Sequence, residues 1–410
     1  MLMGRRNKAR KPENLPGNNY SIINLSGDKE MIKILTSLLI AITVLVSCQV
    51  NNSGHKQEEY IKPDSTYVPL HAKGFVINYY PEYSQIVLKD PWGDSTKYET
   101  FALLKNKAVF EKASKQNDYV LNYPTAKWIA LSSTMVDYAD KLNMKHTISG
   151  VAEPQYIADA YIQEQIDKGT IRNIGLAVAP DVEVLIDLEP DFMMVSPFKD
   201  NHFAAIESAG IPVVTNSDYL EHTPLGRAEW LVFVGELLGE GEKAKQQFKA
   251  IEQEYLLVKE KALKAVSKPT VFTGHIYQGI WYTPAGESYM ANFFNDAGCD
   301  YIYKDTKGTG SLSLDYEVII DKAENTDYWL LIINYPTDIT YSEIEKIDTR
   351  YVDFGAYKHR NIIITNASNS LYFEKGLLQP HIVLSDLVYA VHPGLMGDYK
   401  PTYFTHLKAE

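Results

Sequence analysis

The sequence predicts an α/β protein with two lobes that one long helix joins, preceded by a small antiparallel β element. Three observations indicate this architecture. Strands alternate with helices in two separate stretches, a long amphipathic helix lies between the stretches, and one short helix–strand unit occurs in each of them. The chain has 410 residues, which is enough for two ordinary domains. Its apolar share of 45% is ordinary for a soluble globular protein.

The repeated unit is a short helix that begins near a Glu and leads into a buried strand. Its two copies are Glu183-Val184-Leu185-Ile186-Asp187 and Glu317-Val318-Ile319-Ile320-Asp321, and a hydrophobic stretch follows each copy. Five residues can recur by chance, but these copies fall at comparable places in the two alternating stretches. A matched acid on each lobe is a feature that a symmetric, two-sided partner could bind.

A polar segment and a β-rich segment precede the lobes. Residues 49–66 predict a flexible tether because they contain few apolar side chains. Residues 67–118 predict a small antiparallel extension in which Pro91-Trp92-Gly93-Asp94 forms a turn. We expect the strands of this extension at 75–80, 84–89 and 98–104.

Residues 119–223 and 269–410 are expected to form the N-terminal and C-terminal α/β lobes, the second with the tail of the chain. Strands that alternate with helices favour a parallel sheet with helical crossovers. In the N-terminal lobe we expect strands at 128–132, 147–151, 173–176, 192–195 and 211–214, and helices at 135–142 and 201–209. In the C-terminal lobe we expect strands at 271–274, 328–333 and 362–365, and helices at 288–297, 313–324, 342–348 and 380–391.

The segment 224–268 between the lobes predicts two helices. The first, Pro224–Leu238, ends at Gly239, as a C-terminal glycine stop predicts. The second, Glu242–Val266, has one apolar stripe at spacings of 4, 3, 4, 3 and 4, and would be about 37 Å long at 1.5 Å per residue. Such a helix either packs in the core of one domain or joins two lobes, and its central position and length favour the second interpretation. The stripe consists of Ala244, Phe248, Ile251, Tyr255, Val258 and Ala262.

Residues 1–48 predict a leader with a lipoprotein signal. The apolar run from Ile34 to Val46 has the length of a signal peptide and is short for a membrane span. Leu45-Val46-Ser47-Cys48 resembles the lipobox of bacterial lipoproteins, so we expect Met31 as the start and Cys48 as the lipidated residue. The alternatives are an uncleaved anchor or a chance cysteine. The predicted location is the periplasmic face of a bacterial membrane, with a lipid anchor.

Charge and motif content narrow the class of function. Residues 1–47 hold seven Lys or Arg and three Asp or Glu, so their removal lowers the net charge from −12 to −16. Such a charge argues against nucleic acid as a partner. Cys299 is the other cysteine, which excludes a Cys₂ or Cys₄ zinc site in the mature chain. No catalytic or metal-binding motif is present, and we therefore expect neither an enzyme nor an intrinsic cofactor.

Candidate ligand-binding residues follow from the expected strand ends, because open α/β sheets bind ligands at the carboxyl ends of their strands. Aromatic side chains in these connections predict an aromatic-lined cleft between the lobes. For Trp281, in a glycine-bounded connection, the alternative is that it packs on its own lobe. The predicted ligand-binding residues are Ser133, Tyr156, Phe198, Tyr277, Trp281, Tyr282 and Arg227.

Several motifs, in order, resemble the substrate-binding lipoproteins of ABC importers for ferric siderophores, haem and cobalamin. The resemblance covers roughly residues 120–392, and the β-rich extension lies outside it. The motifs are 128–134 (WIALSST), 147–151 (TISGV), 180–185 (PDVEVL), 188–192 (LEPDF), 209–214 (AGIPVV), 224–230 (PLGRAEW), 296–299 (DAGC) and 314–318 (LDYEV).

The resemblance implies a fold, partners and docking residues. It implies two Rossmann-like lobes joined by one long helix, the class III periplasmic-binding-protein fold. The partners would be an ABC permease with its ATPase, and the two Glu residues that meet permease arginines in that family match Glu183 and Glu317. Exposed acids on rigid helices suit such electrostatic docking.

The ligand class stays open between several alternatives. Few basic residues lie near the candidate connections, which argues against an anionic ferric catecholate. We expect an iron complex, either a siderophore or haem, with a corrinoid as the runner-up. Haem would need an axial ligand such as Tyr277 or His275. Alternatives of a different class are a surface lipoprotein that binds a protein partner, or a hydrolase.

Overall fold

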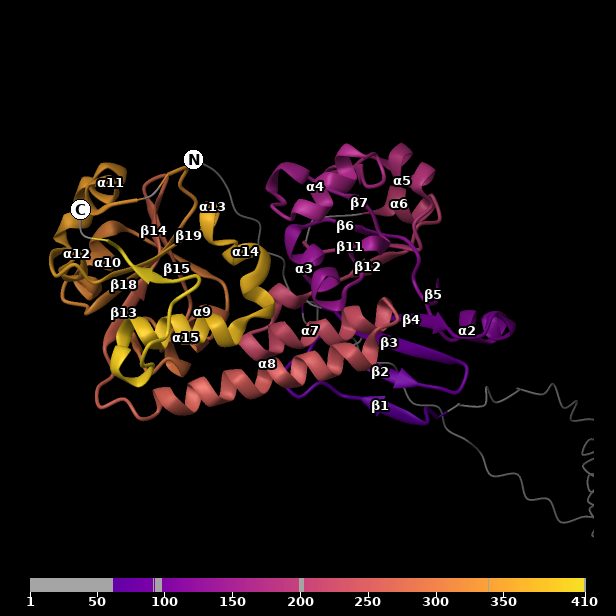
Figure 1. Cartoon of the computed structure of the whole chain (residues 1–410), viewed down its shortest axis with the longest axis horizontal. Helices are drawn as coiled ribbons and strands as arrows, with labels where there is room; N and C mark the ends of the chain where they lie inside the picture. The colour runs from indigo at the N-terminus through magenta and orange to yellow at the C-terminus, as the bar shows by residue number, and fades with distance from the viewer. Residues whose placement is uncertain (1–61, 91, 93–97, 199–202, 338, 409–410) are drawn as a thin grey trace, which may run out of the picture. The chain divides into compact units, whose positions relative to one another are not determined.

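The computed structural model describes residues 62–90, 92, 98–198, 203–337 and 339–408, all within one compact unit (Figure 1). The predicted lipidation site, Cys48, and most of the predicted tether lie outside the described residues. Among the described helices, none has the length and apolar character needed to cross a membrane.

The chain first forms a five-stranded sheet in the order β1-β2-β3-β4-β5. The strands expected from the sequence are present, and β5 joins β4 in parallel while the other pairs are antiparallel. Phe75 on the inner face packs against Trp230 and Phe233 of helix α7, which couples this sheet to the core. The elements are β1 Ser65–Tyr67, β2 Phe75–Tyr79, β3 Tyr83–Lys89, β4 Tyr98–Leu104, α2 Phe110–Ser114 and β5 Tyr119–Asn122.

The N-terminal lobe contains a parallel sheet in the order β12-β11-β6-β7-β8. Its central strands are short, apolar and fully buried, as expected when helices cover both faces of a parallel sheet. Its strands are β6 Trp128–Ala130, β7 Ile148–Val151, β8 Arg172–Asn173, β11 Phe192–Val195 and β12 Val213–Thr215, with the small pair β9 Gly175–Leu176 and β10 Ala179–Pro180. Its helices are α3 Ser133–Leu142, α4 Ala160–Asp167, α5 Val182–Leu188 and α6 Ala204–Ser208.

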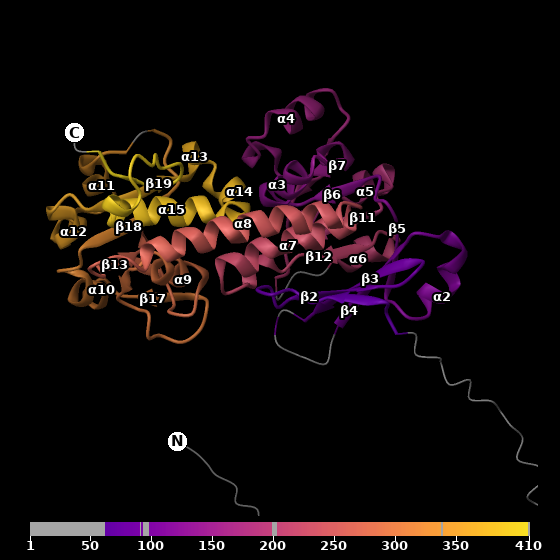
Figure 2. The same ribbon diagram turned by 60° about the horizontal axis from the view of Figure 1, so that its bottom comes forward.

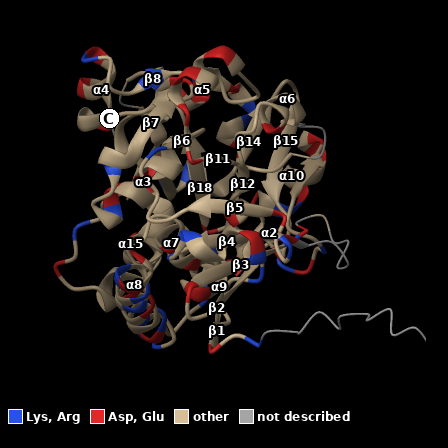
Figure 3. Ribbon diagram, turned by 90° about the vertical axis from the view of Figure 1, so that its right-hand side faces the viewer, with Lys and Arg blue, Asp and Glu red and all other residues tan. Residues whose placement is uncertain are grey.

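Two helices connect the lobes: α7, Pro224–Leu237, and α8, Gly241–Ala262. Nearly all of α7 is buried, and every residue of the predicted stripe on α8 is buried. Helix α8 packs against α7 and against α15 of the C-terminal lobe, and it runs beside elements of both lobes (Figure 2). Many acidic and basic residues lie along its ribbon (Figure 3). The lobe-joining interpretation of α8 is therefore confirmed.

Helix α8 is shorter than the sequence pattern predicts. It ends at Ala262, the last residue of the apolar stripe, whereas the predicted helix extends to Val266. Beyond Ala262 the side chains of Leu263 and Val266 are exposed, so no tertiary packing supports another turn.

The C-terminal lobe contains a sheet in the order β16-β13-β18-β19-β20, parallel except for β20. The lobe also contains a second sheet, which is antiparallel and has the strand order β14-β15-β17. Its first strand, β14, follows β13 directly in the sequence. The strands are β13 Thr270–Thr273, β14 His275–Tyr277, β15 Ile280–Pro284, β16 Asp300–Tyr301, β17 Ser311–Leu314, β18 Tyr328–Ile333, β19 Ile362–Asn366 and β20 Thr405–His406. The helices are α9 Tyr289–Asp296, α10 Tyr316–Ala323, α11 Tyr341–Ile347, α12 Gly355–Lys358, α13 Ala367–Ser370, α14 Tyr372–Lys375 and α15 Pro380–Val391.

The helix predicted over 313–324 is wrong at its start. Residues 311–314 form β17, which pairs with β15, and α10 begins only at Tyr316. Alternate residues of β17 are partly buried and exposed, the period-2 pattern of a strand, and Asp315 separates strand from helix.

The two lobes place the repeated helix–strand unit equivalently. In the N-terminal lobe α5 leads into β11, which pairs in parallel with the first strand of the lobe, β6. In the C-terminal lobe α10 leads into β18, which pairs in parallel with the first strand of that lobe, β13. The repeat therefore marks matching positions in two sheets of related topology.

A buried carboxylate on α7 binds the N-terminal segment to the body. Glu229 is 0% exposed, and its Oε1 accepts hydrogen bonds from the Tyr67 hydroxyl at 2.7 Å and the Leu70 amide at 3.0 Å. Its Oε2 accepts from the amides of His71 and Ala72, both at 2.8 Å. A carboxylate can be buried without a large penalty only when its oxygens are satisfied in this way.

We expect Glu229→Ala to lower the free energy of unfolding by about 3–5 kcal/mol, because it leaves several buried donors without an acceptor. Urea unfolding monitored by circular dichroism measures this change. The matched control is Glu242→Ala on α8, whose side chain is 82% exposed and whose loss should change stability by less than about 1 kcal/mol. A small effect of Glu229→Ala, equal to that of the control, would contradict the role assigned to this carboxylate.

The tail after α15 is held by the same kind of interaction. Asp386 of α15 is 0% exposed and accepts hydrogen bonds from the Tyr399 hydroxyl and from the amides of Thr402, Tyr403 and Phe404. These contacts bring β20 beside β19 at the edge of the sheet.

Candidate ligand-binding pocket between the lobes

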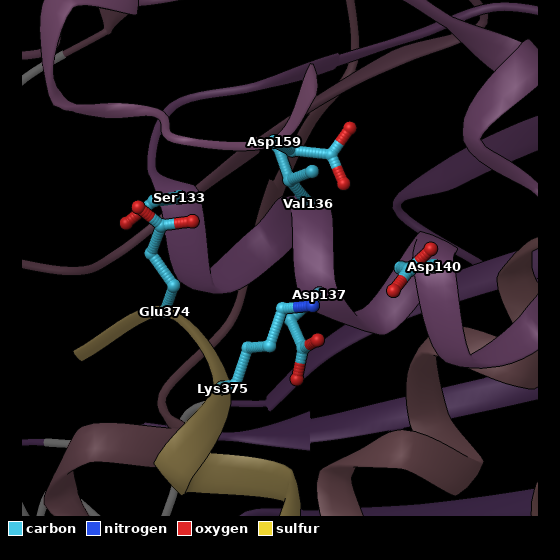
Figure 4. Close-up of a pocket in the computed structure, with 7 residues that line it drawn as sticks. All are labelled: Ser133, Val136, Asp137, Asp140, Asp159, Glu374 and Lys375. Atoms are coloured by element: carbon cyan, nitrogen blue, oxygen red, sulfur yellow. The ribbon is translucent and has the colours of Figure 1, made fainter. Parts of the chain in front are cut away.

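A small pocket lies where α3 of the N-terminal lobe meets α14 of the C-terminal lobe (Figure 4). Glu374 and Lys375 extend from α14 toward α3 in this view. Because both lobes contribute side chains, a group bound here would contact the two lobes at once. The lining residues are Ser133, Val136, Asp137, Asp140, Asp159, Glu374 and Lys375.

Helix α3 presents its polar side chains to the pocket because of their spacing. Ser133, Asp137 and Asp140 stand at positions i, i+4 and i+7, so they share one face of the helix. The opposite face, which includes Met135, Ala139 and Leu142, is buried in the core of the lobe. The core thus fixes the rotation of α3 and directs the polar stripe toward α14.

Two sets of contacts organise the rim of the pocket. The Lys145 ammonium lies 2.8 Å from Asp140 and 2.8 Å from Asp159, so one cation serves two carboxylates of the N-terminal lobe. Glu374 of the C-terminal lobe accepts a hydrogen bond at 3.0 Å from the backbone amide of Ala158. That bond directly links α14 to the segment that precedes α4.

Asp137 is the most unusual of these side chains. It is 3% exposed, and neither of its carboxylate oxygens has a hydrogen-bond partner among the described residues. Burial raises the pKa of Asp137 to about 7, against the opposing effect of Lys141. The side chain therefore changes its charge near neutral pH.

Arg227, a predicted ligand-binding residue, is engaged within the protein. Its Nε lies 3.7 Å from a carboxylate oxygen of Asp218, and its guanidinium lies over the Tyr289 ring at 5.0 Å. Asp218 also accepts a hydrogen bond at 2.8 Å from the buried Tyr138 hydroxyl of α3. With 24% of its side chain exposed, Arg227 connects α7 to both lobes and has its charge balanced by Asp218.

The structure brings one predicted residue, Ser133, into the pocket and leaves four predicted aromatic residues exposed. Tyr156 ends the turn that precedes α4, and Phe198 follows β11 with its ring stacked on Tyr219 at 6.3 Å. Tyr277 and Tyr282 lie on the paired strands β14 and β15. Exposed aromatic rings of this size are available for ligand contact.

The expectation for Trp281 is wrong. This side chain is 0% exposed, donates its indole N–H to the Thr273 carbonyl at 3.1 Å, and packs against Trp329 and Phe354. It packs on its own lobe and does not offer a stacking surface to a ligand.

The reason is that the connection containing Trp281 is a hairpin. Gln278 and Gly279, with φ of 51° and 84°, form its two-residue turn. Strand β15 then alternates, so Trp281 points inward and Tyr282 outward. At Gly274, with φ of 100°, an added Cβ would lie 2.0 Å from the Tyr282 carbonyl oxygen, so the hairpin requires glycine there.

The two predicted docking acids occupy equivalent positions. Glu183 and Glu317 are both exposed and both lie in the first turn of a helix, α5 and α10 respectively. An acid in the first helical turn interacts favourably with the helix dipole and leaves its carboxylate in solvent. Each helix also exposes an apolar side chain nearby, Ile186 on α5 and Val318 on α10.

Sequence reasoning missed most of the pocket lining. Asp137, Asp159, Glu374 and Lys375 were not predicted, and neither was the exposed Phe373 on α14. The helical spacing of Ser133, Asp137 and Asp140 is a signal, but the same spacing is typical of a solvated helix face. Among the described residues, no group of three or more His, Cys, Asp or Glu is arranged to hold a metal ion.

Comparison with solved structures identifies the architecture. The periplasmic heme-binding protein RhuT from Roseiflexus sp. RS-1 superposes with a TM-score of 0.51 and 17% identity, over 66% of this chain and 99% of that one. A periplasmic heme-binding protein from Pseudomonas aeruginosa gives 0.54 and 13%, over 70% and 99%. A protein of an ABC-type Fe³⁺-hydroxamate transport system from Saccharomonospora viridis gives 0.50 and 15%, over 66% and 94%. At these identities the likeness establishes the fold.

Sequence comparison gives the family. An uncharacterized lipoprotein of Methanocaldococcus jannaschii is 29% identical over 369 residues, which cover 84% of this chain and 86% of that protein. Residues 129–367 match the family model described as periplasmic binding protein. The β-rich extension precedes the matched residues. The class III fold and the motif resemblance are thus confirmed, and the chain belongs to the periplasmic binding protein family.

Proposed function

We propose that this protein is the substrate-binding lipoprotein of an ABC importer and captures an iron complex, a siderophore or haem, between its two lobes. The observation that carries the proposal is the two-lobed fold of the periplasmic binding protein family, in which side chains of both lobes meet at the small pocket between α3 and α14, where one group of a larger ligand could be held. Cys48 would be its lipid-anchored residue and a membrane permease its partner. The name of the Methanocaldococcus jannaschii relative supports the lipoprotein assignment.

The connection between the lobes supports capture with little domain movement. Helices α7 and α8 pack along each other and α8 also packs on α15, so the lobes share buried apolar surface. Rotation of one lobe would have to break these contacts. We therefore expect ligand binding mainly to reorder side chains around the pocket, with small changes in the positions of the lobes.

The charges near the pocket favour a neutral or cationic iron complex. Its lining contains four carboxylates and the cation Lys375, while Lys145 is paired with two of the carboxylates and Arg227 is balanced by Asp218. A ferric tricatecholate carries several negative charges and would meet this surface unfavourably. A ferric trihydroxamate has no such excess charge, and the Saccharomonospora viridis protein belongs to a hydroxamate system.

Calorimetric titration of the full-length protein with a ferric trihydroxamate, haemin, cobalamin and a ferric tricatecholate tests the proposal. We expect a Kd below about 1 μM for the trihydroxamate or haemin, and affinity at least about 100-fold weaker for the tricatecholate. Tightest binding of cobalamin would assign a corrinoid in place of iron. Failure of every chelate to bind would reject the proposed function.

We expect Tyr156→Ala to weaken binding of the best chelate by about 10-fold, because one exposed aromatic contact is worth about 1–1.5 kcal/mol. The same titration measures the change. The matched control is Phe110→Ala, since Phe110 is similarly exposed but lies on α2 in the N-terminal extension. Equal effects of the two substitutions would show that Tyr156 does not contact the ligand.

A further inference from the structure

We propose that the pocket between α3 and α14 binds a primary ammonium group of the ligand, with Asp137 as its main acceptor and Glu374 and Ser133 beside it. The inference deepens the proposed function, because it names the chemical group by which the ligand is held between the lobes. It predicts that the cargo is a cationic complex, or one with a pendant amine.

The first argument is the unsatisfied carboxylate. Asp137 lines the pocket and is 3% exposed, and within the part of the chain that the structure describes neither of its oxygens has a hydrogen-bond partner. A buried acceptor without a donor costs free energy that a donor from a ligand would recover. Lys375 lines the same pocket but forms neither a hydrogen bond nor an ion pair with Asp137. A donor from a ligand can therefore bind to the Asp137 carboxylate.

The second argument is the balance of charge. Four carboxylates surround the pocket, those of Asp137, Asp140, Asp159 and Glu374. The Lys145 ammonium is shared between Asp140 and Asp159. The remaining cations that act on Asp137 are Lys141, on the same helix, and Lys375, on α14. The four carboxylates outnumber these three cations, so an added cation is favoured and an added anion is disfavoured.

The third argument is size and geometry. The cavity volume of the pocket is ≈ 10 Å³, which is room for one group as large as a water molecule. An ammonium nitrogen has this size and has three N–H donors, two of which can serve the Asp137 oxygens. A metal ion is a poorer fit, because it needs three or more converging ligands and the described residues form no such group.

Thermal unfolding of the full-length protein at pH 8, with n-pentylammonium chloride or n-pentanol, tests the pocket directly. We expect the ammonium compound at 10 mM to raise Tm by at least 2 °C and the alcohol of equal length to have no such effect. Asp137→Asn should abolish the response, whereas Asp305→Asn, at an exposed position, should preserve it. No response of the wild type, or an equal response of Asp137→Asn, would overturn the proposal and leave a bound water as the partner of Asp137.

A pair of chelates separates this inference from the proposed function. The pair is a linear ferric trihydroxamate with one free primary amine and the same complex with the amine acetylated. We expect wild type to prefer the amine form at least 10-fold, and Asp137→Asn to reduce the ratio to near one. Equal binding of both forms by wild type would refute the ammonium site and retain chelate capture. A rise in Tm with n-pentylammonium, without binding of any chelate, would support the ammonium site and reject chelate capture.

Discussion

Replacement of both Glu183 and Glu317 by alanine is expected to abolish ligand uptake in cells while the purified protein keeps its ligand affinity. The two acids are exposed in the first turns of α5 and α10, at matching positions in the two lobes. A permease with two-fold symmetry would contact both at once, and charged groups at such an interface set orientation and association rate. Neither acid lines the pocket between α3 and α14.

Uptake of radiolabelled ligand and calorimetric titration together measure this result. A single substitution should reduce uptake about 30-fold or more, since truncation of one partner of an interfacial charge pair costs at least about 2 kcal/mol. Asp187→Ala with Asp321→Ala is the matched control, because these exposed acids end the same repeated segments and remove equal charge. Equal losses of uptake in the control, or a parallel loss of ligand affinity, would contradict docking through Glu183 and Glu317.

Asp137→Asn is expected to stabilise the protein increasingly as pH rises from 4 to 8. Burial raises the native pKa of Asp137 from 3.8 to about 7, so the native state binds more protons than the unfolded state between these values. The wild type therefore loses stability as pH rises through this window, and the loss is complete above the native pKa. A shift of this size corresponds to about 4 kcal/mol, and the asparagine variant does not experience it.

Urea unfolding of the two proteins at pH 4, 6 and 8 measures this difference. Subtraction of the two curves removes contributions of other titrating groups that both proteins share. Asp305→Asn serves as the control, since its exposed carboxylate should give a difference that changes by less than about 1 kcal/mol over the range. A difference that does not grow with pH would show that Asp137 is ionised with a satisfied partner in the native state.

Strong periodic patterns predicted the elements that matter most for the architecture. The stripe on α8 repeats over six positions, and each of these side chains is buried. The strands before the lobes follow period-2 alternation, and the structure places them almost at their expected bounds. The repeat containing Glu183 and Glu317 indicated two related lobes. In each lobe the strand that follows the repeated helix pairs in parallel with the first strand of the sheet.

Local patterns failed where the same residues suit two structures. The helix predicted over 313–324 includes Ser313 and Leu314, but pairing with β15 makes residues 311–314 a strand. Trp281 lies between Gly279 and exposed Tyr282, which resembles a ligand-contacting connection, and only the hairpin directs its ring into the core. Tertiary pairing decides such cases because strand propensity depends on the partner strand.

The sequence by itself determined the two lobes, the helices between them and the two matched acids, since these depend on patterns within about 25 residues of chain. Only the tertiary structure decided the pocket. Ser133, Asp137 and Asp140 form a polar stripe that would be solvated on an isolated α3. Residues more than 230 positions later, in α14, cover that stripe. Burial then raises the pKa of Asp137 and leaves its oxygens without donors among the residues that the structure describes. Desolvation depends on what lies nearby in space, and the order of residues along the chain does not reveal it.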